Sequence, residues 1–261
     1  MNFFKKSLGQ NFLKDNNVIN KILSVTNIKD KNILEIGPGK GSLTDQILRK
    51  KPKSLILIEK DTNLFNELKI KYSKNKKIKI FNDDILKFDI EKILLKNSNI
   101  FGNLPYNISS QILVKFLKFS KWPPKFDNLV FMFQKELGEK IICNHPSPDY
   151  GRLSIITNYR LNIVKKFLVS ANCFFPKPKI NSIVIHFTPK KKISFKIKKI
   201  DNLEKITNIF FSNKRKMINK NIQKIVDQNK IKSISGLKLN LRPADIKPEI
   251  YYKITELFEN N

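Results

Sequence analysis

An amide side chain, free carbonyls and an aromatic ring come together in the segment Asn103-Leu104-Pro105-Tyr106. A proline two residues after Asn103 prevents a regular helix there and keeps the backbone extended. The apolar residues 100–102 predict that the segment ends a strand, and an open α/β sheet binds its ligands at such ends. Asn103 can then accept hydrogen bonds from an amino group while the Tyr106 ring stacks over a flat base. The segment predicts an adenine site, although a turn with a packed tyrosine could have the same sequence.

A short apolar strand at 32–36 leads into the glycine-rich turn 37–41 (GPGKG), and a helix is expected to follow through Leu48. Strand, glycine-rich turn and helix open a nucleotide-binding α/β fold. The spacing of the glycines differs from the G-x-G-x-x-G pattern of dinucleotide sites, and a P-loop has no use for an acid such as Glu35 at its ligand. Gly37 and Glu35 therefore indicate a ligand without phosphates, such as S-adenosylmethionine with its ammonium and sulfonium groups. A plain glycine turn is the alternative.

Carboxylates follow the next two expected strands. Glu59 comes after the strand 55–58, roughly 20 residues beyond the glycine turn, where it can accept hydrogen bonds from both ribose hydroxyls. Asp84 comes after the strand 77–81 and can accept a hydrogen bond from an adenine amino group, with Asp83 as its competitor. Either aspartate can instead serve as a turn or cap residue.

The rest of the chain gives a coarse plan of helices and strands. Helices are expected over 15–25, 62–71, 109–119 and 134–143, with Asp15 and Asp61 as caps of the first two. Further strands are expected over 99–102, 128–133, 153–159 and 180–187. From about residue 200 apolar residues recur at helical spacing. We therefore expect an α/β domain over 1–190 and a small all-α domain over 191–261.

A loop at 173–179 (CFFPKPK) places Phe174 and Phe175 beside two prolines and two lysines. Such a loop suits base stacking and contact with a nucleic-acid backbone. A buried phenylalanine pair in an extended connection fits the same residues equally well.

The chain is strongly basic, with 51 Lys and Arg against 22 Asp and Glu and a net charge of +29. A surface of this kind usually has a polyanionic partner, and nucleic acid leads that class. Genome bias toward lysine codons is the competing explanation. No apolar run is long enough for a transmembrane helix or a signal peptide, which favours a cytoplasmic protein. Two distant cysteines without a histidine cluster argue against a structural zinc site.

A series of motifs occurs in one order along the chain. They are QNFL at 10–13, EIGPGKG at 35–41, Glu59, Asp84, FGNLPYNIS at 101–109, FQKE at 133–136, YGRLS at 150–154 and FFPKPKINS at 174–182. In this combination the chain resembles the bacterial small-subunit ribosomal RNA adenine N6,N6-dimethyltransferase family (KsgA/RsmA). The resemblance spans nearly the whole chain and implies a class I methyltransferase, with a Rossmann-like seven-stranded sheet followed by a small helical domain.

The resemblance also implies roles for individual residues. Contacts with the cofactor S-adenosyl-L-methionine would come from Asn11, Leu13, Gly37, Glu59, Asp84 and Asn103. As a hypothesis for the mechanism, we expect Asn103, Leu104 and Tyr106 to be catalytic, and Tyr106 and Phe174 to hold the target base. The implied substrate is a pair of adjacent adenosines in the 3′-terminal hairpin loop of 16S rRNA, within the small ribosomal subunit or its precursor. We expect a monomer that needs no metal and takes part in ribosome biogenesis.

Three other functions share parts of this pattern. A 23S rRNA adenine N6-methyltransferase of the Erm type uses the same cofactor and chemistry, but Leu104, the YGRLS run and the C-terminal helices favour the small-subunit enzyme. A ribosome-assembly factor whose binding role outweighs catalysis is the alternative from another class. A DNA adenine methyltransferase shares only the Asn-x-Pro-Tyr motif.

Overall fold

A computed structural model describes residues 11–260, apart from the side chains of residues 228 and 229. The chain forms two compact units. The first consists of the residues up to 115 together with 121–138 and 162–189, and the second of 116–120, 139–161 and the residues from 190 onward. Residues 139–161 thus belong with the C-terminal helices, and the division does not follow a single boundary after residue 190.

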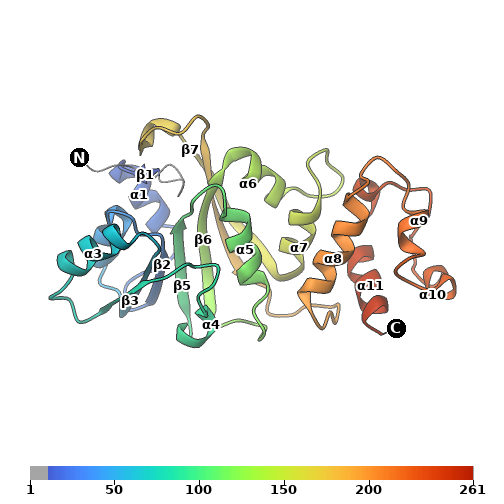
Figure 1. The fold of residues 1–261 in the computed structure, drawn as a ribbon, viewed down its shortest axis with the longest axis horizontal. Helices are drawn as coiled ribbons and strands as arrows, with labels where there is room; N and C mark the ends of the chain where they lie inside the picture. Colours follow the sequence, from blue (N-terminus) through green and yellow to red (C-terminus); the bar gives the residue numbers. More distant parts are fainter. Residues whose placement is uncertain (1–10, 261) are drawn as a thin grey trace. The chain divides into compact units, whose positions relative to one another are not determined.

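The first unit is built on a seven-stranded sheet (Figure 1). Its order is β4 (Ile78–Asn82), β3 (Ser54–Glu59), β2 (Asn32–Ile36), β5 (Ser98–Asn103), β6 (Phe126–Gln134), β9 (Ser182–Pro189) and β7 (Leu161–Val169). The first five strands in this order pair in parallel, and β9 pairs antiparallel to β6. The expected Rossmann-like seven-stranded sheet is confirmed.

The strand order reverses at β2, because β3 pairs with one of its edges and β5 with the other. Ile36 lies opposite Ile58 on β3 and opposite Gly102 on β5, so the three strands end level with one another. A reversal of this kind opens a crevice at the carboxyl ends of the strands. The register therefore brings the glycine turn, Glu59 and Asn103 to one edge of the sheet.

Helices connect these strands. They are α1 (Asn16–Leu23), α2 (Ser42–Arg49), α3 (Thr62–Lys71), α4 (Ile90–Ile93), α5 (Ser109–Leu117) and α6 (Lys135–Ile142). Asp15 caps α1 by accepting a hydrogen bond from the Val18 amide at 3.0 Å, and Asp61 caps α3 by accepting one from the Asn63 amide at 2.9 Å. Both expected caps are confirmed, and each fixes the point at which a strand end turns into a helix.

The strand expected over 153–159 is wrong, because this segment lies in α7 (Arg152–Arg160). Its run of β-branched residues favours a strand locally, but the side chains of the helix are buried on several faces, which removes the helical stripe from the sequence. Ser154 starts the helix by accepting a hydrogen bond from the Gly151 amide at 3.1 Å. The last strands of the sheet are instead β7, which the sequence did not predict, and β9.

The second unit contains α7 and the C-terminal helices α8 (Ile200–Phe211), α9 (Asn219–Ile222), α10 (Gln228–Lys232) and α11 (Pro248–Glu259). The expected C-terminal helices are confirmed. A buried tyrosine joins α11 to α7, since the Tyr252 hydroxyl donates to the Ile155 carbonyl at 2.9 Å. The Tyr251 hydroxyl donates to the Pro243 carbonyl, in the segment before α11, at 2.7 Å.

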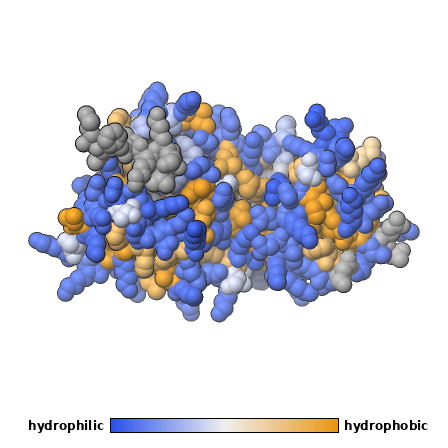
Figure 2. All heavy atoms as spheres, viewed as in Figure 1, coloured by the Kyte–Doolittle hydropathy of each residue, from blue (hydrophilic) through white to orange (hydrophobic). Residues whose placement is uncertain are grey.

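Hydrophilic residues cover most of the face drawn in Figure 2, as the net charge of +29 predicts. Within residues 11–260, every helix is too short or too polar to pass through a bilayer.

Gly138 on α6 lies where the helix crosses β9. A Cβ at this position would be 2.0 Å from Cγ2 of Ile183, whose buried, β-branched side chain has little room to move. We expect Gly138→Ala to destabilise the protein by about 1–3 kcal/mol, despite the higher helix propensity of alanine. Chemical denaturation measures this change.

Gly151→Ala is the matched control, because a Cβ there would have Phe211 as its nearest neighbour at 3.8 Å. It should change the stability by less than about 1 kcal/mol. Equal effects of the two substitutions would contradict the proposed clash.

Candidate active site

A pocket opens at the carboxyl ends of β2, β3 and β5, and β4 is followed by residues that also line it. All of the predicted site residues except Phe174 line this pocket: Asn11, Leu13, Gly37, Glu59, Asp84, Asn103, Leu104 and Tyr106. Gln10, the first residue of the QNFL motif, lies outside the described residues. The fold thus brings predicted site residues from positions 11 to 106 to one cavity.

Asn103, the last residue of β5, is oriented by the backbone of the N-terminal segment. Its Nδ2 donates a hydrogen bond to the Asn11 carbonyl at 2.9 Å. Because the amide nitrogen is engaged there, Oδ1 is the end of the side chain that faces away from this contact. The sequence did not show whether Asn11 closes over a ligand or makes a turn, and in the structure its carbonyl orients Asn103. Asn103 keeps its side-chain oxygen as a hydrogen-bond acceptor for a ligand.

Tyr106 is held at both of its ends. Its hydroxyl hydrogen-bonds the Ser182 Oγ at 2.6 Å, and its carbonyl accepts a hydrogen bond from the Ser109 hydroxyl at 3.1 Å. Burial raises the pKa of the Tyr106 phenol, which therefore stays neutral. Ser182 begins β9, so the sheet itself fixes the direction of a ring that lines the pocket.

Glu59 at the end of β3 ties the glycine turn to the start of α3. Its Oε2 accepts from the Gly39 amide at 3.0 Å and its Oε1 from the Asp61 amide at 2.9 Å. Burial raises the pKa of this carboxyl. Gly39 has φ +59° and the Phe12 ring 2.7 Å from where a Cβ would stand, so both the turn and the close approach require glycine here.

Glu35, near the end of β2, is a buried acid that also lines the pocket. The Thr44 hydroxyl donates to its Oε2 at 2.7 Å. Burial is the main cause that raises the pKa of Glu35 to about 8, so the carboxyl is largely protonated at neutral pH.

The raised pKa of Glu35 predicts a pH-dependent stability. Between pH 4.5 and about 8 the folded protein holds a proton that the unfolded chain has released, so the free energy of unfolding falls as pH rises through this window. The slope from this one group reaches about 1.4 kcal/mol per pH unit. Glu35→Gln keeps an oxygen for Thr44 and should remove this slope, which denaturation at several pH values measures. Parallel pH profiles of the two proteins would contradict the assignment.

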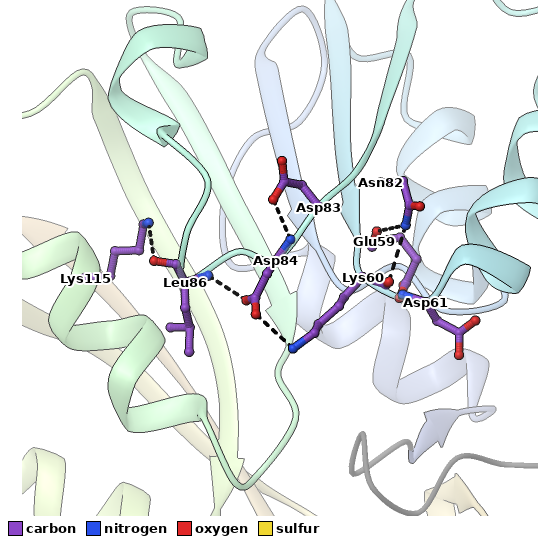
Figure 3. A network of polar contacts seen from close by, with 8 residues as sticks. All are labelled: Glu59, Lys60, Asp61, Asn82, Asp83, Asp84, Leu86 and Lys115. Atoms are coloured by element: carbon purple, nitrogen blue, oxygen red, sulfur yellow. Dashed lines mark hydrogen bonds and ion pairs between the residues drawn. The ribbon is translucent and has the colours of Figure 1, made fainter.

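Asp84 lies in the network drawn in Figure 3, between the side chain of Lys60 and the backbone of the following residues. Its Oδ2 is 2.8 Å from Lys60 Nζ, and its Oδ1 accepts from the Leu86 amide at 2.9 Å. The hydrogen bond from Lys60 lowers the pKa of Asp84, which is therefore a carboxylate at neutral pH. The competing acid, Asp83, accepts from the Asp84 amide at 2.7 Å and so helps to shape the turn.

Phe174 is not brought to the pocket. It pairs with Leu13 across the two short strands β1 (Phe12–Leu13) and β8 (Phe174–Phe175), and its side chain is 1% exposed within the core. This burial does not favour the predicted role of Phe174 as a clamp on the target base, which stays a prediction. Phe175, the next residue, is 57% exposed. Strand alternation turns one of the two rings inward and the other outward, and the sequence did not show which.

Lys60 is a charged residue of the pocket that sequence reasoning missed. Its position directly after Glu59 at a strand end was the available signal. Among residues 11–260, no group of three or more His, Cys, Asp or Glu side chains is arranged to hold a metal ion.

Comparisons with known proteins show the family of the chain. The ribosomal RNA adenine dimethylase family matches residues 1–260. Ribosomal RNA small subunit methyltransferase A of Pelagibacter ubique is 47% identical over 257 residues, which cover 98% of this chain and 97% of that protein. The protein of the same name from Blochmanniella pennsylvanica is 36% identical over 261 residues, covering 98% of this chain and 96% of that protein.

Two solved structures share the fold. A dimethyladenosine transferase from Plasmodium falciparum has a TM-score of 0.74 at 24% identity, covering 93% of this chain and 95% of that one. The 23S rRNA methyltransferase ErmE has a TM-score of 0.70 at 22% identity, covering 95% of this chain and all of that one (100%). At these identities the structures show the fold alone, whereas the full-length sequence matches show that the chain belongs to the ribosomal RNA adenine dimethylase family.

Proposed function

We propose that the protein transfers methyl groups from S-adenosylmethionine to N6 of two adjacent adenosines in the 3′-terminal hairpin loop of small-subunit ribosomal RNA. The observation that carries this proposal is the orientation of Asn103. Its amide nitrogen is bound to the Asn11 carbonyl, so its oxygen remains for an amino group in a pocket that also holds Glu59 and Asp84. Full-length relatives named as small-subunit methyltransferases support the choice of RNA.

The pocket offers a matching group for each polar part of the cofactor. Glu59 would accept hydrogen bonds from the ribose hydroxyls, since each of its oxygens has a second lone pair beyond the backbone amide that it already binds. Asp84, a carboxylate at neutral pH, would accept a hydrogen bond from the adenine amino group. Gly37, with φ +64° and open space for 4 Å around the point where a Cβ would stand, leaves room for the methionine part. Asn11 and Leu13 would close the pocket from the N-terminal side.

The target amine is a poor nucleophile, because its lone pair is delocalised into the adenine ring. The Asn103 side-chain oxygen and the Leu104 carbonyl would accept its two hydrogens, which favours a pyramidal nitrogen and stabilises the positive charge that develops there. Tyr106, fixed by Ser182, would stack on the base after its extraction from the RNA. When bound, the cofactor supplies an electrophilic methyl group on its sulfonium.

In this mechanism most of the rate gain would come from aligning the amine with the methyl group, and the chain needs no strong general base. The methylated nitrogen is an acidic ammonium that loses its proton readily. For the second transfer a single hydrogen remains on N6, so one of the two acceptors would hold it while the lone pair turns again toward the cofactor.

The basic surface would bind the phosphate backbone of the RNA. Lys214-Arg215-Lys216, a dense basic cluster between α8 and α9, is a candidate contact. Under this proposal the protein acts as a cytoplasmic monomer on the small subunit or its precursor.

The test is a transfer assay with labelled S-adenosylmethionine and three substrates: unmethylated small subunits, large subunits and DNA. We expect label in the small-subunit RNA, and mapping should place it on two adjacent adenosines near the 3′ end. Label confined to large-subunit RNA or DNA would overturn the choice of substrate. Binding to small subunits without any transfer would instead support a pure assembly factor.

A further inference from the structure

Lys60 and Asp84 form one polar edge of the pocket. Lys60 directly follows Glu59 at the end of β3, and its ammonium reaches across to Asp84 beyond the end of β4 (Figure 3). The distance from Nζ to the Asp84 Oδ2 is 2.8 Å, and both residues line the cavity. The pocket therefore presents a hydrogen-bond donor and a hydrogen-bond acceptor side by side.

The position of this pair matters more than its strength. The two side chains are 54% and 18% exposed, and ion pairs of this exposure contribute little to stability. A surface pair without a ligand nearby would have no further consequence. Here the acceptor is the group that the proposed function places against the 6-position of the cofactor's purine.

A lone carboxylate and a carboxylate with an ammonium beside it differ in which purine 6-substituents they can pair. A lone carboxylate accepts from the 6-amino group of adenine and repels the 6-oxo group of hypoxanthine, which is itself an acceptor. An ammonium in the same place can donate to a 6-oxo group and relieve the repulsion. Sites that leave a polar group unpaired reject a ligand strongly, whereas sites that can pair it do not.

We propose that Lys60 sets the base selectivity of the cofactor site, by adding a donor to the Asp84 acceptor so that both 6-amino and 6-oxo purines can be paired. The inference rests on the proposed function, because it takes Asp84 to be the residue that faces the purine. It assigns to Lys60 a specificity role, and no role in the transfer itself.

The experiment compares two ligands in four proteins. S-Adenosylhomocysteine and S-inosylhomocysteine are titrated by calorimetry into the wild type and into Lys60→Met, Lys60→Arg and Lys87→Met. Methionine keeps the length and the apolar stem of lysine. Lys87 is the matched control, since it is exposed and its charge acts on Asp84 only through space.

In Lys60→Met we expect the affinity for the adenosyl ligand to stay within about threefold and that for the inosyl ligand to fall at least about tenfold, the effect of one lost hydrogen bond and an unrelieved repulsion. Lys60→Arg and Lys87→Met should keep the wild-type ratio of the two affinities. An unchanged ratio in Lys60→Met, or an equal loss of both ligands, would overturn the inference. Failure of the wild type to bind S-adenosylhomocysteine would count against the proposed function instead.

Discussion

Replacing Asn103 by alanine should lower methyl transfer about 10²- to 10³-fold, the usual effect of removing one preorganised hydrogen-bonding group from a site where charge develops. The substitution removes the oxygen that would accept a hydrogen of the target amine. RNA binding should remain within about threefold, because Asn103 is not one of the basic residues that are proposed to bind the phosphates. Single-turnover transfer and a filter-binding assay with unmethylated small subunits measure the two quantities separately.

The bond from Asn103 to the Asn11 carbonyl is also lost in this variant, at a cost of about 1 kcal/mol, so a thermal melt must show that the protein is folded. Asn107→Ala is the matched control. It removes the same amide from the same segment, and although this exposed side chain also borders the pocket, it has no part in the proposed transfer. Near wild-type turnover in Asn103→Ala would show that the acceptor lies elsewhere.

The parallel strands of the sheet could be predicted, because each is a short apolar run that can be recognised in the local sequence. β2, β3 and β5 are short, buried and mostly apolar. Gly37 follows the first of them, and Glu59 and Asn103 end the other two, so each strand leads to a residue that can contact a ligand. Parallel strands share one carboxyl edge, so the positions of Gly37, Glu59 and Asn103 in the chain already imply that they meet. The register between the strands bears this out.

The prediction failed where burial overrides local preference. The segment 153–159 has the composition of a strand, yet it forms a helix whose several faces are covered, so its helical period is absent from the sequence. The strand β7 carries lysines and exposed apolar residues at the sheet edge, and such a mixture gives no alternating pattern. Tertiary contacts decide both segments.

In the site, too, local features could be predicted from the sequence and long-range contacts could not. Residue types at strand ends predicted which side chains line the pocket, but not the contacts that orient them. The contact from Asn103 to Asn11 joins residues 92 apart, and the ion pair between Lys60 and Asp84 joins residues 24 apart. Neither spacing has a local signature. The choice between Phe174 and Phe175 depends on the pairing of β8 with β1, which is also a long-range contact.

Replacing Glu59 by glutamine should weaken binding of S-adenosylhomocysteine about 10²-fold. Hydrogen bonds to a carboxylate contribute about 1.5–3 kcal/mol each, and the variant replaces one of the two acceptor oxygens of Glu59 by a donor. The new NH₂ group would also face the amide of either Gly39 or Asp61, which both donate to Glu59. Calorimetry gives the affinity, and a melt of the ligand-free protein gives the structural part of the effect. Glu67→Gln, at an exposed position of α3, is the matched control and should bind like the wild type.

A ligand without the ribose 2′-hydroxyl separates a direct contact from a disturbed glycine turn. If Glu59 binds that hydroxyl, the 2′-deoxy analogue of S-adenosylhomocysteine should bind the wild type at least about tenfold more weakly than the parent ligand, the effect of one charged hydrogen bond. In Glu59→Gln the same change of ligand should have little further effect, because the partner of the hydroxyl is already altered. Equal losses in the two proteins would mean that Glu59 acts only through the turn that it holds, and that the ribose is recognised by another group.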